Sequence, residues 1–189
     1  MVTPIIPLPT TQTADGLTPA QVAKLQTMPQ FNVLWMLART GWLNEIIALL
    51  AVMFKPDDFP QRDRETMVLR ISSLLAADYP IAQHRFFGRT AGLTSEEIEA
   101  ILRDDTGALD PWTAQLCTFC DEISQNVILS EKSVQTLTDH YGPNAATQAI
   151  WLMSWFNMLA RFTASTRIPI ETPETLAAAT GGSPSIAAA

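Results

Sequence analysis

The chain has 189 residues, of which 47% are hydrophobic and only 16% are charged. This length is usual for one domain, and so much apolar material can fill a sizeable core. The formal net charge of −7 excludes the clustered positive charge that binding to nucleic acid requires, so we expect no nucleic-acid partner.

Apolar segments of this chain are too short for a membrane. The runs 42–54 and 150–162 are interrupted by polar residues, and each is shorter than the roughly 20 apolar residues of a spanning helix. The first residues lack the basic start and continuous apolar core of a secretory signal. Two cysteines make no disulfide framework. We therefore expect no membrane association and a reducing, cytoplasmic location.

The elements expected along the chain are all helical, because no alternating strand pattern occurs. Thr18 before Pro19 and Asp110 before Pro111 are typical of helix starts. Thr94, with a glutamate three residues later, is typical of a capping box. The fold class predicted is all-α. Helices are expected at 18–28, 31–39, 43–54, 60–77, 80–91, 95–103, 111–127, 131–140 and 144–166, with a break at Tyr141-Gly142-Pro143.

The two ends of the chain differ from this helical body. Residues 1–17 are rich in proline and threonine, and residues 171–189 form a small-residue tail. Neither end has much to bury, so both are expected to be flexible. Residues 18–170 are expected to form a single helical domain.

Glu65 and His84 are the main candidates for chemistry. Proline fits the first turn of a helix and favours an extended residue before it, so Pro80 predicts that Tyr79 lies in the kink between two helices. If these helices pack as an antiparallel hairpin, Glu65 approaches His84. A carboxylate and an imidazole are groups for acid/base catalysis. Gly88, one turn after His84, leaves room for a substrate or a neighbouring backbone.

The stretch 62–100 resembles the signature of the carboxymuconolactone decarboxylase and alkylhydroperoxidase D-like superfamily. Its peroxidase branch has Glu, eleven residues, Cys, two residues, Cys, three residues, His. The same count gives Glu65, Ala77, Pro80 and His84 here. Without either thiol, the dithiol peroxidase mechanism is excluded at this site. The resemblance covers roughly 30–172 and implies a multi-helix orthogonal bundle of the alkylhydroperoxidase D-like type, built around a central helical hairpin and assembled as a trimer or hexamer.

These residues and the resemblance predict a cofactor-independent acid/base enzyme for a small carboxylate- or carbonyl-bearing molecule. Decarboxylation, isomerisation and β-elimination remain open, on a polyketide-like or aromatic-derived substrate. His84 is the predicted general acid/base, Glu65 sets its tautomer or relays the proton, and Tyr79 or an arginine steadies the enolate. The family's decarboxylases need no metal or organic cofactor, and none is predicted here.

Arg85 and Arg89 are candidates for binding the substrate. They are four residues apart on one helical face, a spacing that suits a clamp for a carboxylate or enolate. The alternative is a solvated basic stripe or a set of contacts at a subunit interface.

The last long helix supplies further candidates. An aromatic stripe at i, i+4, i+7 and i+11 is expected to lie in the core or to line a pocket. Asn157 and Arg161, one turn apart in a pattern that resembles the end of this helix in the family, are expected to be buried substrate contacts or part of a subunit-spanning network. The stripe consists of Trp151, Trp155, Met158 and Phe162.

Cys117 and Cys120 form a CxxC motif, but Ser124 stands where a redox pair would need its histidine. They are interpreted as small apolar core residues. Arg70 interrupts an apolar run and is expected to form a structural ion pair. Two alternatives to the acid/base enzyme stay open, a thiol peroxidase that uses Cys117 and Cys120, and a non-catalytic ligand-binding protein.

Overall fold

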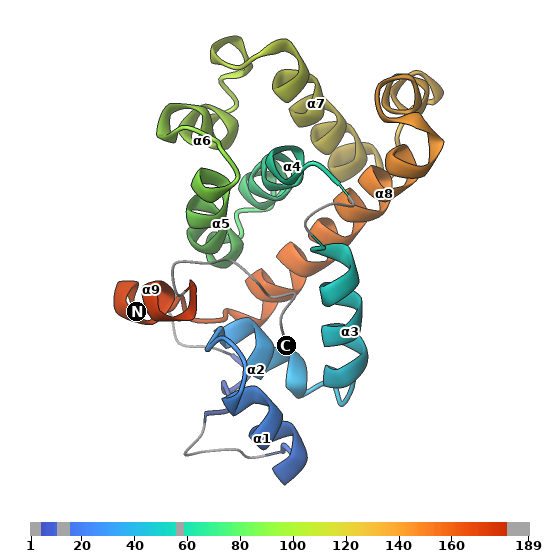
Figure 1. The fold of residues 1–189 in the computed structure, drawn as a ribbon. Helices are drawn as coiled ribbons and strands as arrows, with labels where there is room; N and C mark the ends of the chain where they lie inside the picture. Colours follow the sequence, from blue (N-terminus) through green and yellow to red (C-terminus); the bar gives the residue numbers. More distant parts are fainter. Residues whose placement is uncertain (1–4, 11–15, 56–58, 181–189) are drawn as a thin grey trace. The chain divides into compact units, whose positions relative to one another are not determined.

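In a computed structural model, the described residues are 5–10, 16–55 and 59–180. They contain α-helices and one short 3₁₀ turn and no strand, which confirms the all-α prediction (Figure 1). The helices are α1 (Pro19–Gln26), α2 (Asn32–Ala38), α3 (Leu43–Met53), α4 (Gln61–Leu74), α5 (Asp78–Thr90), α6 (Ser95–Arg103), α7 (Pro111–Asn126), α8 (Glu131–Thr166) and α9 (Pro173–Thr180).

The chain divides into two compact units. Unit 1 comprises Met1–Lys55 and Ser165–Ala189, with helices α1 to α3 and α9. Unit 2 comprises Pro56–Ala164, with helices α4 to α7 and almost all of α8. Every residue predicted to carry chemistry belongs to unit 2.

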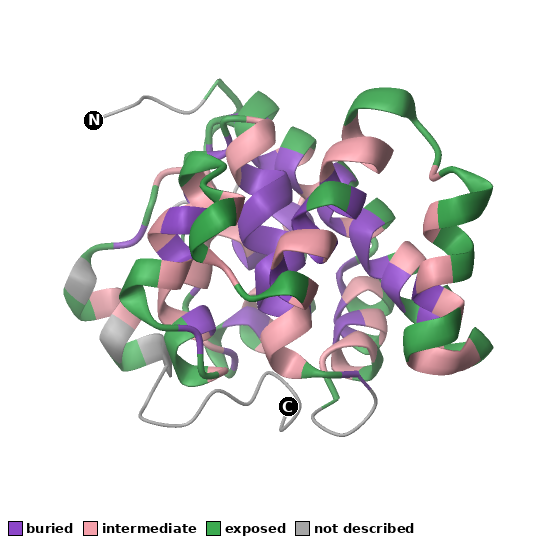
Figure 2. Cartoon of the chain, turned by 90° about the horizontal axis from the view of Figure 1, so that it is seen from above, coloured by how far each residue is buried: buried purple, intermediate pink, exposed green. Residues whose placement is uncertain are grey.

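Helix α4 forms the centre of unit 2. Every residue from Arg64 to Ser72 is buried (purple in Figure 2), and α4 packs against α5, α6 and α7. A helix buried on all sides is a core helix, whose polar residues must find partners inside the protein. One apolar cluster around it contains Leu69, Leu93, Ile98, Ile101 and Cys117.

The predicted helix starts are confirmed. The side chains of Thr18 and Thr94 each accept a hydrogen bond in a complete capping box. Asp110 accepts from the backbone N–H groups of Trp112 and Thr113. These side chains satisfy N–H groups that have no acceptor within their own helices.

The predicted break at Gly142 is confirmed as a kink. Gly142 has φ 77° and ψ 166°, and helix continues on both sides of it in α8. Glycine adopts this positive φ without a steric penalty, and Pro143 then begins the second half of the helix, where its missing N–H costs nothing.

The connection between α4 and α5 differs from the prediction. Helix α4 ends at Leu74 and α5 already begins at Asp78, so the prediction that Tyr79 lies in the kink is wrong. Tyr79 lies in the first turn of α5. Pro80 fits there as well, because the first N–H groups of a helix have no intrahelical acceptor. Ala76, with φ 48°, makes the turn instead.

Unit 1 is closed by its C-terminal segment. The buried carboxylate of Glu171 accepts a 2.5 Å hydrogen bond from the backbone N–H of Asn32, and the Asn32 side chain donates to the carbonyl of Pro169. Helix α9 follows, so part of the predicted tail is helical. Thr172 precedes Pro173 and its hydroxyl accepts from the N–H of Thr175, which is a helix start that the sequence analysis missed.

None of the helices in the described ranges has the length and apolar character needed to cross a membrane.

Candidate active site

Glu65 and His84 meet between α4 and α5. Glu65 Oε2 lies 2.6 Å from His84 Nδ1. The Glu65 side chain is 4% exposed and the His84 side chain 14% exposed. The hairpin expected from the sequence therefore brings the carboxylate to the imidazole, at a hydrogen-bond distance typical of a charged acceptor.

The remaining surroundings of the pair come from three elements. The His84 ring lies 5.5 Å from the Phe87 ring and 6.2 Å from the Phe156 ring, measured between centroids, and Phe156 is fully buried. Arg64 Nε lies 3.4 Å from Glu65 Oε1, the oxygen that does not face His84. The imidazole thus has one ionic neighbour and two aromatic ones. Its Nε2 atom makes no hydrogen bond with any described residue.

Tyr79 lies within the first turn of α5, one residue before Pro80. It is 5% exposed, and its hydroxyl accepts a 3.3 Å hydrogen bond from Gln83 Nε2. Tyr79 and Gln83 are one turn apart, and His84 follows directly.

Gly88 serves packing and does not open a space for a substrate. A Cβ atom at this position would lie 3.3 Å from methyl groups of Leu69 and Leu93, and 3.4 Å from one of Ile98. The space predicted beside Gly88 is therefore filled by apolar side chains. The missing side chain of Gly88 lets α5 pack close to α4 and α6.

The two arginines of the predicted clamp have separate surroundings. Arg85 forms an ion pair with Glu99 of α6 through Nη1, and this pair holds the pKa of Glu99 below its ordinary value. Arg89 is exposed and makes no hydrogen bond or ion pair with the described part of the chain. A substrate would have to displace Glu99 before Arg85 and Arg89 could act together.

Of the two predictions for the aromatic stripe of α8, a place in the core is wrong for Trp151 and Met158. Trp151 is 54% and Met158 46% exposed, and Trp155 and Phe162 are half-buried. Because apolar residues occur on both faces of this helix, periodicity alone does not decide which face packs. The face that packs is offset by one residue and contains Leu152, Met153, Phe156 and Ala160.

Asn157 is buried as predicted, but Arg161 is exposed, so that half of the prediction is wrong. The amide of Asn157 donates 3.0 Å to Ser124 Oγ of α7 and 3.1 Å to the carbonyl of Met153. Its oxygen accepts 2.7 Å from Arg161 Nη1. All of these contacts join α8 to α7 or to itself, which is a structural role.

Cys117 and Cys120 lie in the core, as the sequence interpretation expects. Both are fully buried and neither is in a disulfide. Burial raises the pKa of Cys117 to about 12 and raises that of Cys120 as well. Because the thiolate is the reactive form, these thiols are poor candidates for redox chemistry.

Arg70 forms the predicted structural ion pair. It donates to both oxygens of Asp121, at 2.5 Å and 2.8 Å, and lies 2.7 Å from Asp104. This bidentate ion pair satisfies hydrogen-bond donors of a guanidinium whose side chain is only 4% exposed.

One polar cluster was missed by the sequence analysis. Asp63 Oδ2 accepts a 2.5 Å hydrogen bond from the hydroxyl of Tyr141 and a 3.3 Å one from Trp112 Nε1. Burial, together with Asp63, raises the pKa of Tyr141. His140 stacks on Trp112 with 3.5 Å between ring centroids. Trp112 and Tyr141 lie 49 and 78 positions from Asp63 in the sequence, so no local pattern could predict that they contact it.

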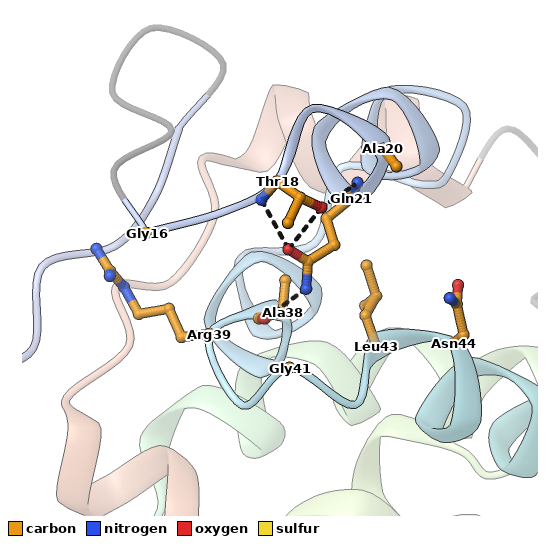
Figure 3. A pocket seen from close by; sticks show the side chains of 9 residues that line it. All are labelled: Gly16, Thr18, Ala20, Gln21, Ala38, Arg39, Gly41, Leu43 and Asn44. Atoms are coloured by element: carbon orange, nitrogen blue, oxygen red, sulfur yellow. Dashed lines mark hydrogen bonds between the residues drawn. The ribbon is translucent and has the colours of Figure 1, made fainter.

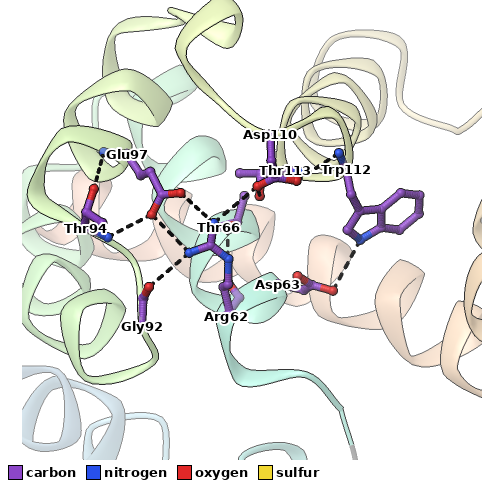
Figure 4. Close-up of polar contacts among 9 residues, drawn as sticks. All are labelled: Arg62, Asp63, Thr66, Gly92, Thr94, Glu97, Asp110, Trp112 and Thr113. Atoms are coloured by element: carbon purple, nitrogen blue, oxygen red, sulfur yellow. Dashed lines mark hydrogen bonds and ion pairs between the residues drawn. The ribbon is translucent and has the colours of Figure 1, made fainter.

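Arg62 joins three helix starts next to that cluster (Figure 4). It pairs with both oxygens of Glu97, at 3.1 Å and 2.7 Å, and lies 3.3 Å from Asp110. Glu97 and Asp110 also cap α6 and α7, so Arg62 fixes the beginning of α4 against both.

Unit 1 contains an open pocket of about 480 Å³ (Figure 3). Gln21 crosses it, accepting from the N–H of Thr18 and donating to the carbonyl of Ala38. Arg39 extends from it toward Gly16. None of the residues predicted to carry chemistry lines this pocket.

Comparisons with protein-family models, with curated proteins and with solved structures gave no match to this chain. The resemblance to the carboxymuconolactone decarboxylase superfamily therefore stays a prediction from the residues quoted above.

Proposed function

We propose that this protein is a cofactor-independent acid/base enzyme for a small organic molecule that bears a carboxylate or a carbonyl group. The proposal rests on the 2.6 Å contact between Glu65 Oε2 and His84 Nδ1. It includes membership of the carboxymuconolactone decarboxylase superfamily, in a branch that has Ala77 and Pro80 in place of the redox cysteines.

The roles of the pair follow from its hydrogen bond. An ionised carboxylate can only accept, so the proton between the two groups belongs to Nδ1, and Nε2 of a neutral imidazole keeps its lone pair. Nε2 is the atom that the described residues leave unused. Glu65 therefore selects the tautomer and stabilises the imidazolium that forms when Nε2 takes a proton.

In an isomerisation, Nε2 removes a proton from the carbon next to the substrate carbonyl, and the electron pair of that C–H bond moves to the oxygen as an enolate. The imidazolium then returns the proton to another carbon. In a decarboxylation, the C–C bond to the carboxylate breaks and CO₂ leaves. The electron pair of that bond forms the enolate, and a protonated His84 then donates a proton to its carbon. In a β-elimination, the enolate expels a leaving group. All three need one group that holds and moves a proton.

Two features favour one kind of substrate. Phe87 and Phe156 give the imidazole aromatic neighbours, which suit an aromatic or polyketide-like molecule better than a sugar. Tyr79, whose hydroxyl accepts from Gln83 one turn away, is the candidate for stabilising the enolate oxygen. Arg85 is a weaker candidate while it is bound to Glu99.

Mass spectrometry of small molecules tests this proposal. A panel of carboxylated lactones and β-keto acids, with a host extract, is incubated with wild type, with His84→Ala and with Cys117→Ala as the matched control. A product of changed mass, or a shifted isomer, is expected from wild type and the cysteine variant alone. A product that forms equally with His84→Ala contradicts the assigned roles. Binding of a candidate without turnover by any variant favours the ligand-binding alternative.

A further inference from the structure

The open pocket of unit 1 has an unusual charge. Among the described residues that line it, Arg39 is charged and none is acidic. A second cation lies beside it, because Lys24 Nζ donates 2.9 Å to Oδ1 of the lining residue Asn44. Unit 1 has four Lys and Arg residues and four Asp and Glu residues, so the net charge of −7 falls entirely on unit 2. An anion therefore meets the least repulsion in unit 1, and a cation pair at this pocket.

Arg39 has donors that the described part of the chain does not use. Its Nε donates 2.9 Å to the carbonyl of Pro7, and its two Nη groups make no hydrogen bond or ion pair with any described residue. A Cβ added at Gly16, whose φ is 82°, would lie 3.1 Å from Nη1, so glycine lets the chain pass this close to the guanidinium. Two Nη groups are the fork that binds a carboxylate through parallel hydrogen bonds.

Asn44 supplies a second donor, on the other side of Gln21 from Arg39 (Figure 3). An ammonium can only donate, so Lys24 holds Oδ1 of Asn44, and Nδ2 remains for a ligand. Gln21 itself is already satisfied, since it accepts from Thr18 and donates to the carbonyl of Ala38. The pocket thus has a cationic donor at one end and a neutral donor at the other.

We propose that this pocket binds a small organic acid, with its carboxylate on Arg39 and a second oxygen acceptor on Asn44 Nδ2. The volume of about 480 Å³ lies within the range of about 300–1,000 Å³ that small-molecule sites occupy. The apolar lining residues Ala20, Ala38 and Leu43 suit the carbon chain between the two polar ends. Dicarboxylates and keto acids have this pattern. The proposal is independent of the proposed function, whose residues all belong to unit 2.

NMR titration of the full ¹⁵N-labelled chain with succinate and 2-oxoglutarate tests the site. We expect saturable shifts of the side-chain signals of Arg39 and Asn44, with a dissociation constant of about 1 mM or lower. Succinamide has the same carbon chain without charge and should bind at least about tenfold more weakly, because hydrogen bonds between charged groups are the stronger ones. Equal affinity for succinamide, or no saturation with either acid, overturns the proposal.

Variants locate the bound acid. Asn44→Asp keeps an acceptor for Lys24 and suits the first turn of α3, but it places negative charge where Nδ2 should donate. Asn44→Asp and Arg39→Gln should each weaken succinate binding by about tenfold or more. The matched control is Lys55→Gln, which removes an exposed cation of unit 1 outside the pocket and should keep the wild-type affinity. Wild-type affinity in Asn44→Asp, or binding that is lost with His84→Ala and kept with Arg39→Gln, overturns the proposal.

Discussion

The pairs Glu65–His84 and Cys117–Cys120 lie in the same unit, and each consists of two residues that can do chemistry, but their surroundings are opposite. Glu65 and His84 contact each other at 2.6 Å, and the imidazole is 14% exposed. Cys117 and Cys120 are fully buried, and burial raises the pKa of both. Spacing alone therefore does not identify a site. The imidazole has an ionic partner and is partly exposed, whereas both thiols are fully buried in the core.

The largest expected difference between the pairs is in catalysis. With a substrate found in the panel above, His84→Ala should lower kcat by about 10²- to 10⁴-fold, the usual contribution of a general acid or base. Glu65→Gln should lower it less, because an amide still contacts the ring but no longer stabilises an imidazolium. A protein with Cys117→Ala and Cys120→Ala should keep its turnover. Steady-state kinetics of the three variants measure this, and a cysteine variant as inactive as His84→Ala would reverse the comparison.

The next largest effect is expected on stability, at Arg70. The charge of Arg70 favours a lower pKa of Cys117, against the effect of burial. Its charge is already committed to Asp121 and Asp104, so it does not activate the thiol. Arg70→Met should lower the free energy of unfolding by about 3 kcal/mol, because Asp121, whose side chain is 27% exposed, loses two charged hydrogen bonds from Arg70. Urea unfolding measures this.

The control is Arg85→Met, which removes an ion pair whose side chains are 37% and 39% exposed. It should cost at most about 1 kcal/mol. Equal losses of unfolding free energy in the two arginine variants would mean that the buried ion pair of Arg70 stabilises the fold no more than the exposed pair of Arg85.

A smaller effect is expected at the thiols themselves. Cys117→Ser puts a hydroxyl beside Leu69, Ile98 and Ile101 and should cost about 1–3 kcal/mol of stability. Since burial raises the pKa of Cys117 to about 12, a thiol reagent at neutral pH should label the folded wild type slowly and the urea-unfolded chain rapidly. Fast labelling of the folded protein would show reachable thiolates and favour the peroxidase alternative.

The smallest expected effect is the loss of stability in acid that comes from the ion pairs of Arg62 with Glu97 and Asp110. A hydrogen bond from Arg62 lowers the pKa of Glu97, and the hydroxyl of Thr113, with further help from Arg62, lowers that of Asp110. A lowered folded-state pKa gives stability that is present above the ordinary carboxyl pKa of about 4 and is lost as the pH falls through the lowered value. Arg62→Gln should flatten this loss between about pH 5 and 3 in urea unfolding. An unchanged pH slope would contradict the assignment.

Local chemistry made much of the fold predictable. Thr18, Thr94 and Asp110 satisfy helix ends within three residues of themselves, and Gly142 forms a kink that other residues reach only with strain. Such signals act over one helical turn. The sequence therefore predicted where these helices begin and where the last long helix bends.

What the sequence could not predict depends on residues far apart in the chain. Asp63 meets Tyr141 from 78 positions away. The packed face of α8 was predicted wrongly because Trp151 and Met153 are equally apolar and only the neighbouring helices distinguish them. The 2.6 Å contact of Glu65 with His84 lay between these cases, since a short hairpin was predictable but the side-chain distance was not.

Deuterium incorporation is the sharpest test of His84 as an acid/base group, because it follows proton transfer whether or not the reaction is completed. Candidate ketones and β-keto acids are incubated in D₂O with wild type, His84→Ala and Cys117→Ala, and deuterium at carbon is measured by NMR. We expect exchange with wild type and Cys117→Ala and loss of that exchange with His84→Ala. Exchange of the same rate with His84→Ala would contradict it.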